Sequence, residues 1–151
     1  MAIGSHLVAR VGDKRVALRL AHVVEVMRPL PVATLGGTPP FVLGAAVVRG
    51  SAVPVVDARA LLGEGPASTR DARFVSVRVG DRRAVLAVDA VLGVRALDDV
   101  SVGQMPPILR DASEGVPELL GALDRDLLLV LDAGRLVPES AWRAIAGTDR
   151  T

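Results

Sequence analysis

Side chains that could do chemistry are few in this sequence, and none stands at a catalytic or metal-binding spacing. His6 and His22 have no carboxylate cluster at ligand-like spacing, so we expect no metal ion. We expect His6 to be a terminal surface residue. His22 comes just before an apolar segment and is expected to be a turn residue or a half-buried residue. No Gly-x-Ser-x-Gly nucleophile motif occurs, and cysteine is absent. The sequence therefore predicts no catalytic residue and no cofactor, and an enzyme of unrecognised type stays a minor alternative.

Two further features resemble ligand sites but have simpler explanations. Gly36-Gly37 lacks the strand–loop–helix setting and the Lys-Ser/Thr ending of a phosphate-binding loop, so we expect a flexible loop. Asp57 and Asp132 each end an apolar run and are followed by Ala. Their equivalent placement predicts that both cap the N-terminus of a short helix rather than hold a metal.

A charge at the tip of an apolar hairpin is the feature that most favours a binding role. The runs 42–48 and 52–56 are apolar on both faces, and Arg49-Gly50 joins them. A small barrel covers only one face of such strands, so lobe packing or a partner protein must cover the rest. Arg49 is then either a solvated turn residue or an interface anchor. Glu25 leaves the same choice, because it interrupts the apolar run Val23–Val26.

The elements that would position these residues come from a duplicated unit. The segment 10–26 recurs further along the chain as 78–94, including the shared tetrapeptide Arg-Val-Gly-Asp. This self-similarity predicts one supersecondary unit used twice within a single domain. We expect lobe one at about 7–63, a linker at about 64–71, lobe two at about 72–138 and a C-terminal helix at about 139–147.

Short valine-rich runs separated by turn residues predict a small all-β barrel or sandwich. Phe41 and Phe74 lie beside such runs and are expected in the core. A short helix is expected at 58–62, and long loops at 29–40 and 98–117. The expected strands are 7–11, 16–20, 23–27, 42–48, 52–57, 73–79, 84–88, 91–97, 119–123 and 127–131.

Composition narrows the function classes further. The 151 residues carry 18 basic and 17 acidic side chains, with two Phe, one Trp and no Tyr. A nucleic-acid surface would need a basic groove with stacking aromatics, so none is predicted. No signal-peptide pattern or apolar run of membrane length occurs, which favours a cytoplasmic protein without membrane insertion. The alternative from another class is a small β-barrel that binds nucleic acid or a small ligand.

Four motifs together resemble the CheW family, the adaptor domain of bacterial chemosensory arrays. They are Val23-Val24-Glu25-Val26, Pro39-Pro40-Phe41-Val42-Leu43-Gly44, the run from Arg49-Gly50 to Pro54-Val55-Val56-Asp57, and Val88-Asp89-Ala90-Val91-Leu92-Gly93-Val94. The resemblance runs from about residue 7 to 137. Two positions depart from the family pattern, because Val47 stands where the family usually has Asn and Ala58 where it has Leu.

The resemblance implies two intertwined SH3-like five-stranded β-barrels with short helices and a groove between them. It implies a non-enzymatic adaptor that couples the cytoplasmic tips of chemoreceptors to the regulatory domain of a CheA-type histidine kinase. Such an adaptor is expected to be monomeric when free and to be recruited to receptor arrays. Chemotaxis, motility, pilus and developmental pathways all stay open. The protein-binding residues that it implies are Val24, Glu25, Gly44, Val47, Val48, Arg49, Gly50 and Val94.

Overall fold

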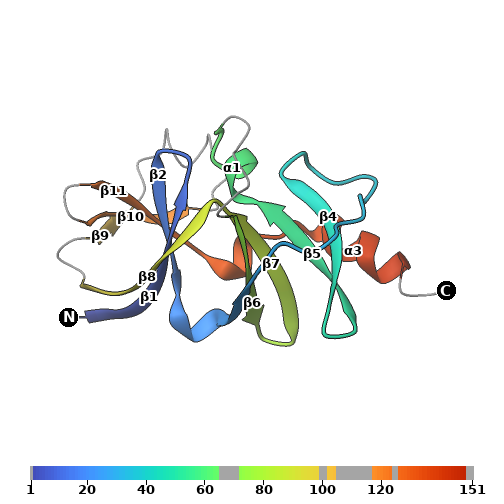
Figure 1. The fold of residues 1–151 in the computed structure, drawn as a ribbon, viewed down its shortest axis with the longest axis horizontal. Coiled ribbons are helices and arrows are strands. Elements are labelled where there is room, and N and C mark those ends of the chain that lie inside the picture. The colour runs from blue at the N-terminus through green and yellow to red at the C-terminus, as the bar shows by residue number, and fades with distance from the viewer. Residues whose placement is uncertain (1, 65–71, 99–101, 105–116, 124–125, 149–151) are drawn as a thin grey trace.

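The computed structural model describes residues 2–64, 72–98, 102–104, 117–123 and 126–148. Side chains are described for residues 4–64, 72–78, 80–96 and 128–146. Two sheets lie next to each other, with β1 (Ala2–Val11) reaching one end of the molecule and helix α3 (Glu139–Thr148) lying at the other (Figure 1).

Short turns link most of the strands, as the sequence predicted. The other strands are β2 Lys14–Arg19, β3 Val23–Met27, β4 Val42–Val48, β5 Ser51–Asp57, β6 Arg73–Val79, β7 Arg82–Val88, β8 Ala90–Asp98, β9 Val102–Gln104, β10 Pro117–Leu123 and β11 Asp126–Leu131. The other helices are the 3-10 helix η1 Leu20–His22, α1 Ala58–Leu61 and the 3-10 helix η2 Ala133–Arg135.

The described strands form a 6-stranded sheet in the order β8-β1-β2-β11-β10-β9 and a 5-stranded sheet in the order β3-β6-β7-β5-β4. Each sheet takes its central hairpin from the other half of the chain. The β1–β2 hairpin lies among strands of the second half, and the β6–β7 hairpin among strands of the first half (Figure 1). The chain halves 7–63 and 72–138 are therefore not the two sheets.

The duplication is visible in the register of the strands. β5 pairs in parallel with β7 through Val55 and Val85, and β11 pairs in parallel with β2 through Val130 and Ala17. These two pairings occupy the same place in the repeat, because Ala17 and Val85 are equivalent positions of the segments 10–26 and 78–94. The all-β fold of two interlocked SH3-like units is thus confirmed, with an exchange of hairpins that makes each unit depend on both halves.

The largest core cluster draws on both sheets. Leu7, Leu18, Val56 and Leu86 belong to it, and so does Phe41. Because all these side chains are buried together, neither sheet has a complete interior of its own. The other expected core aromatic, Phe74, is also buried and lies in a second cluster inside the 5-stranded sheet.

Several local expectations are confirmed. Asp57 Oδ1 accepts a hydrogen bond from the amide of Arg59 at 3.0 Å, and Asp132 Oδ1 accepts one from the amide of Gly134 at 2.9 Å. Both aspartates therefore cap the N-terminus of a short helix, as predicted.

Two expectations are wrong. His6 is 0% exposed rather than a terminal surface residue. Its strand begins at Ala2 and lies between β2 and β8, so residues near the start of the chain are covered on both sides. The expected loop at 98–117 contains the strand β9, which pairs with β10 and adds an edge to the 6-stranded sheet. Residues 99–101 and 105–116 of that loop lie outside the described part of the chain.

Candidate interaction surface

Exposed apolar side chains are concentrated on edge strands. β3 and β4 are the two edges of the 5-stranded sheet, and β8 is an edge of the 6-stranded sheet. The exposed large apolar residues on them are Val24, Val26, Leu43, Val47, Leu92 and Val94. Val47 is the most exposed of these, at 68%. An edge strand offers unpaired backbone groups as well as side chains, so apolar edges of this kind suit contact with another protein.

The turn between β4 and β5 holds Arg49 in an unfavourable backbone conformation. Val48 and Ser51 pair across a two-residue turn in which Arg49 has φ 50° and Gly50 has φ 83°. Positive φ at both central positions defines a tight hairpin turn in which Asn, Asp or Gly usually takes the first place. Arg49 is the only described residue other than glycine with positive φ. Such strain often marks a functional position.

The guanidinium group of Arg49 forms a fork with the carboxylate of Glu25. Arg49 Nη2 donates to Glu25 Oε2 at 2.6 Å, and Nε donates to Oε1 at 3.2 Å. The hydrogen bond from Arg49 lowers the pKa of Glu25, and Glu25 raises the pKa of Arg49. The pair joins the β4–β5 turn to β3, although β3 and β4 stand at opposite ends of the strand order. The 5-stranded sheet is therefore rolled so that its two edges meet at this ion pair.

Gly44 has an internal role that the sequence did not show. It has φ +146°, and a Cβ atom there would lie 1.9 Å from the carbonyl oxygen of Ala33. That close approach allows a two-way backbone pairing of Ala33 with Ala45, with N···O distances of 2.9 and 2.8 Å. Gly44 thus lets the loop before β4 pair with that strand. Part of the β4 edge is therefore already paired within the protein.

The structure divides the sequence-predicted residues into two groups. Val24, Val47, Arg49, Gly50 and Val94 are exposed, and Glu25 is partly exposed. Gly44 and Val48 are buried, so in the free protein they shape the surface rather than form it. Residue by residue reasoning missed Val26, Leu43 and Leu92. Side chains two positions apart on a strand lie on the same face, so the expected exposure of Val24 could have indicated Val26, and the structure shows both exposed.

An ionic cluster behind the β1–β2 turn was also missed, and it is structural. Asp89 is 5% exposed, accepts a hydrogen bond from the amide of Gly12 at 2.6 Å and forms an ion pair with Arg59. Arg10 Nη1 lies 4.0 Å from the same carboxylate. Because Asp89 follows β7 while Gly12 belongs to the β1–β2 turn, the cluster ties the two sheets together.

The described residues include no group of three or more His, Asp or Glu side chains placed to hold a metal ion. Among the helices of the described part, none has the length and apolar character that crossing a bilayer requires. The geometry above, an exposed ion pair set among apolar edge strands, is that of a protein-interaction module.

Comparisons with known proteins agree with this class. The profile of the CheW-like domain matches residues 5–141. The protein FrzA of Myxococcus xanthus is 32% identical over 143 residues, which cover 91% of this chain and 87% of FrzA. A probable chemotaxis protein CheW of Rhizobium etli is 28% identical over 137 residues, covering 89% of this chain and 88% of that protein.

A solved structure shares the fold over most of its length. The crystal structure of the scaffolding protein TtCheW from Thermoanaerobacter tengcongensis is similar with a TM-score of 0.75 and 25% sequence identity, covering 85% of this chain and 88% of that one. This chain belongs to the CheW family. These matches favour the adaptor over the alternative of a barrel that binds nucleic acid or a small ligand.

Proposed function

We propose that this protein is a non-enzymatic adaptor of a bacterial chemosensory array, coupling chemoreceptors to a CheA-type histidine kinase. Its membership of the CheW family and its similarity to a scaffolding protein support this role. Within it, the partner surfaces are the cytoplasmic tip of the receptor and the regulatory domain of the kinase. The free adaptor is a cytoplasmic monomer that its partners recruit to the array.

The observation that carries the proposal is the Arg49–Glu25 fork among exposed apolar residues. The chain keeps Arg49 in a strained turn position, 68% exposed in its side chain, where glycine would be easier to accommodate. An arginine already oriented by a carboxylate presents its remaining N–H groups in a fixed direction. Val24 and Val47 add exposed apolar surface on the two edge strands that the pair joins. Preorganised arginine beside apolar surface is typical of residues that dominate binding energy.

The adaptor would couple receptor and kinase by binding them at different edge strands. Binding the receptor on one edge and the kinase on another raises the effective concentration of each partner for the other. Receptor state reaches the kinase if the adaptor binds the kinase's conformations with different affinity. In this scheme Val24, Glu25, Val47, Arg49, Gly50 and Val94 contact partners, while Gly44 and Val48 hold the β4 edge in shape.

The test is co-sedimentation of Arg49→Ala with receptor-containing membranes and with the kinase, beside thermal unfolding of the same variant. We expect binding of at least one partner to weaken by about tenfold, as for loss of an interface hot spot. The melting temperature should barely change, because the ion pair is exposed. The matched control is Arg78→Ala, an exposed arginine that donates to the carbonyl oxygen of Gly80. Unchanged binding by the Arg49 variant, or its unfolding, would contradict the proposal.

A further inference from the structure

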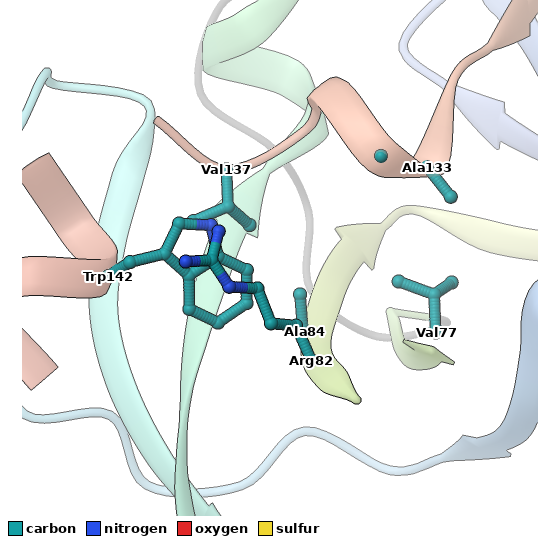
Figure 2. A pocket seen from close by; sticks show the side chains of 7 residues that line it. Val77, Arg82, Ala84, Ala133, Val137 and Trp142 are labelled. Atoms are coloured by element: carbon teal, nitrogen blue, oxygen red, sulfur yellow. The ribbon is translucent and has the colours of Figure 1, made fainter. Parts of the chain in front are cut away.

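A second candidate binding site lies between the β6–β7 hairpin, the 3-10 helix η2 and helix α3. It is a hollow of about 150 Å³. Val77 and Ala84, cross-strand neighbours in the hairpin, form part of its lining, together with Val137 and the indole ring of Trp142. Figure 2 shows Val77 and Ala84 on the hairpin, Val137 on the segment between η2 and α3, and Arg82 lying across the indole ring of Trp142. A hollow of roughly this size has room for one benzene-sized group.

Arg82 gives the hollow a charged rim. Its guanidinium carbon lies 4.9 Å from the centre of the Trp142 ring, and its Nη1 donates to Glu139 Oε1 at 3.0 Å. The side chains of Arg82 and Glu139 are 52% and 63% exposed, so solvent screens their attraction. A carboxylate from outside can therefore compete with Glu139 for Arg82 at little cost.

The duplication supplies an internal comparison for this pair. Lys14 and Arg82 are equivalent positions of the repeated segment, and Glu64 is equivalent to Glu139 when the two capping aspartates are aligned. Lys14 Nζ and Glu64 Oε1 form an ion pair in the first half, as Arg82 and Glu139 do in the second. The side chains of Lys14 and Glu64 are only 36% and 16% exposed. The two equivalent ion pairs therefore differ in exposure: the Lys14–Glu64 pair of the first half is largely covered, and the Arg82–Glu139 pair of the second half is open to solvent.

Residues of different size stand at the equivalent positions of the two halves. Val16 and Leu62 of the first half correspond to the smaller Ala84 and Val137, and Arg59 corresponds to Gly134. Ala84, Val137 and Gly134 all line the hollow. The second half therefore keeps the hairpin and the short helix but has smaller side chains at these three positions of the lining.

The side chains that gather beside the β1–β2 hairpin indicate which groups would suit the hollow beside the β6–β7 hairpin. Arg59 extends from α1 to the carboxylate of Asp89, which also accepts the hydrogen bond from the Gly12 amide. The residue that corresponds to Asp89 in the first copy of the repeat is Ala21. At the first-half hairpin, Arg59 of the first half thus supplies an aliphatic stem and Asp89 of the second half supplies a carboxylate. Gly134 and Ala21, the corresponding residues for the second-half hairpin, can supply neither group.

We propose that this hollow is a docking pocket for one large apolar side chain of a partner protein, such as Leu, Met or Phe, with an acidic residue beside it. The apolar side chain would lie on Val77, Ala84 and Val137 against the indole, and the neighbouring carboxylate would pair with Arg82. None of the lining residues belongs to the adaptor surface around Arg49 and Val47. The pocket is therefore a further contact point that shares no lining residue with that surface.

Trp142 makes the test direct, because it is the only tryptophan in the chain. The probes are three blocked dipeptides, acetyl-Leu-Asp-amide, acetyl-Leu-Asn-amide and acetyl-Ala-Asp-amide, titrated against the full chain. The readouts are Trp142 fluorescence and the NMR signal of its indole N–H. We expect saturable binding of Leu-Asp, about three- to tenfold weaker binding of Leu-Asn at low salt, and at least about tenfold weaker binding of Ala-Asp.

Variants that copy the first half test whether the pocket itself is responsible. Ala84→Val introduces the residue that the first half has as Val16, and Gly134→Arg introduces its Arg59. Each should reduce Leu-Asp binding by about tenfold while thermal unfolding stays cooperative. Arg82→Lys should retain most of the preference for Leu-Asp over Leu-Asn, and Arg82→Gln should abolish it.

Three results would overturn the proposal. One is the absence of any Trp142 response at roughly 10 mM Leu-Asp. The dissociation constant would then lie above the value expected for one apolar side chain and one ion pair. Another is equal binding of Leu-Asp and Leu-Asn to the wild type, which removes Arg82 from the site. The third is binding of 4-methylpentanoate as tight as that of Leu-Asp, which would make the pocket a small-molecule site.

Discussion

Arg49 and Glu25 belong to distant parts of the chain, yet they close the 5-stranded sheet with a two-point hydrogen bond of 2.6 and 3.2 Å. The two residues belong to the β4–β5 turn and to β3, the elements at opposite ends of the strand order. The side chains of Arg49 and Glu25 thus connect the two outer strands of the sheet, β3 and β4, which are not neighbours in the strand order. The consequence is a surface in which charge, exposed valines and open strand edges lie on the same elements.

Arg49→Gly should separate binding from stability. Glycine adopts the positive φ of this position without the steric cost that Arg49 bears, so the melting temperature should rise slightly. Partner binding should fall to the level of Arg49→Ala, because the guanidinium group is lost. Calorimetry together with co-sedimentation measures both effects. A stabilised variant with full binding would show that Arg49 is only a turn residue.

Gly44→Ala should destabilise the protein by about 2 kcal/mol or more. The new Cβ would lie 1.9 Å from the carbonyl oxygen of Ala33, at a φ of +146° that alanine rarely adopts. Urea denaturation gives the change in unfolding free energy. Gly36→Ala is the matched control, because a Cβ at Gly36 meets nothing within 4 Å. Equal stability of the two variants would mean that the loop before β4 moves aside freely.

Asp89→Asn should lower the free energy of unfolding by about 3 kcal/mol. The change removes the negative charge that pairs with Arg59 in a part-buried setting and weakens the hydrogen bond from the Gly12 amide. Chemical denaturation checks the size of the loss. Asp81→Asn, at an exposed turn position, serves as the control and should stay within about 0.5 kcal/mol of the wild type. A loss no larger than that of the control would show that Asp89 does not hold the sheets together.

His6 should make stability depend on pH in the mildly acidic range. Burial lowers its pKa from 6.5, with Arg19 contributing, while the hydrogen bond to the carbonyl oxygen of Gly4 opposes the shift. The unfolded chain therefore takes up a proton before the folded chain does. Stability is full above pH 6.5 and falls as the pH drops below it, until folded His6 also becomes protonated.

Replacing this side chain tests the assignment. His6→Leu should flatten the pH dependence below 6.5, because no titrating group remains at that buried position. Denaturation midpoints over a pH series measure the slope. A slope that survives in the Leu variant would assign it to other groups.

Patterns along the chain were sufficient to predict most local structure. β3, β4 and β6 have the bounds that the apolar runs predicted, because alternation and turn residues act over a few positions. The helix caps at Asp57 and Asp132 were predictable for the same reason, since a cap depends only on residues two positions away. The positions of Glu25 and Arg49 on a strand and a turn were also predictable, but their pairing was not.

The sequence by itself determined the duplication, the all-β class, the two aspartate helix caps and the family. Each of these depends on a pattern of neighbouring residues or on the repeated segment. Only the tertiary structure decided that the halves exchange hairpins, that His6 is buried, that Gly44 admits Ala33 and that Arg49 meets Glu25. The physical reason is that long-range pairing depends on which strands become neighbours when the whole core forms. Two copies of one sequence unit satisfy their local rules equally well in separate or exchanged sheets, and burial of the shared core selects the exchange.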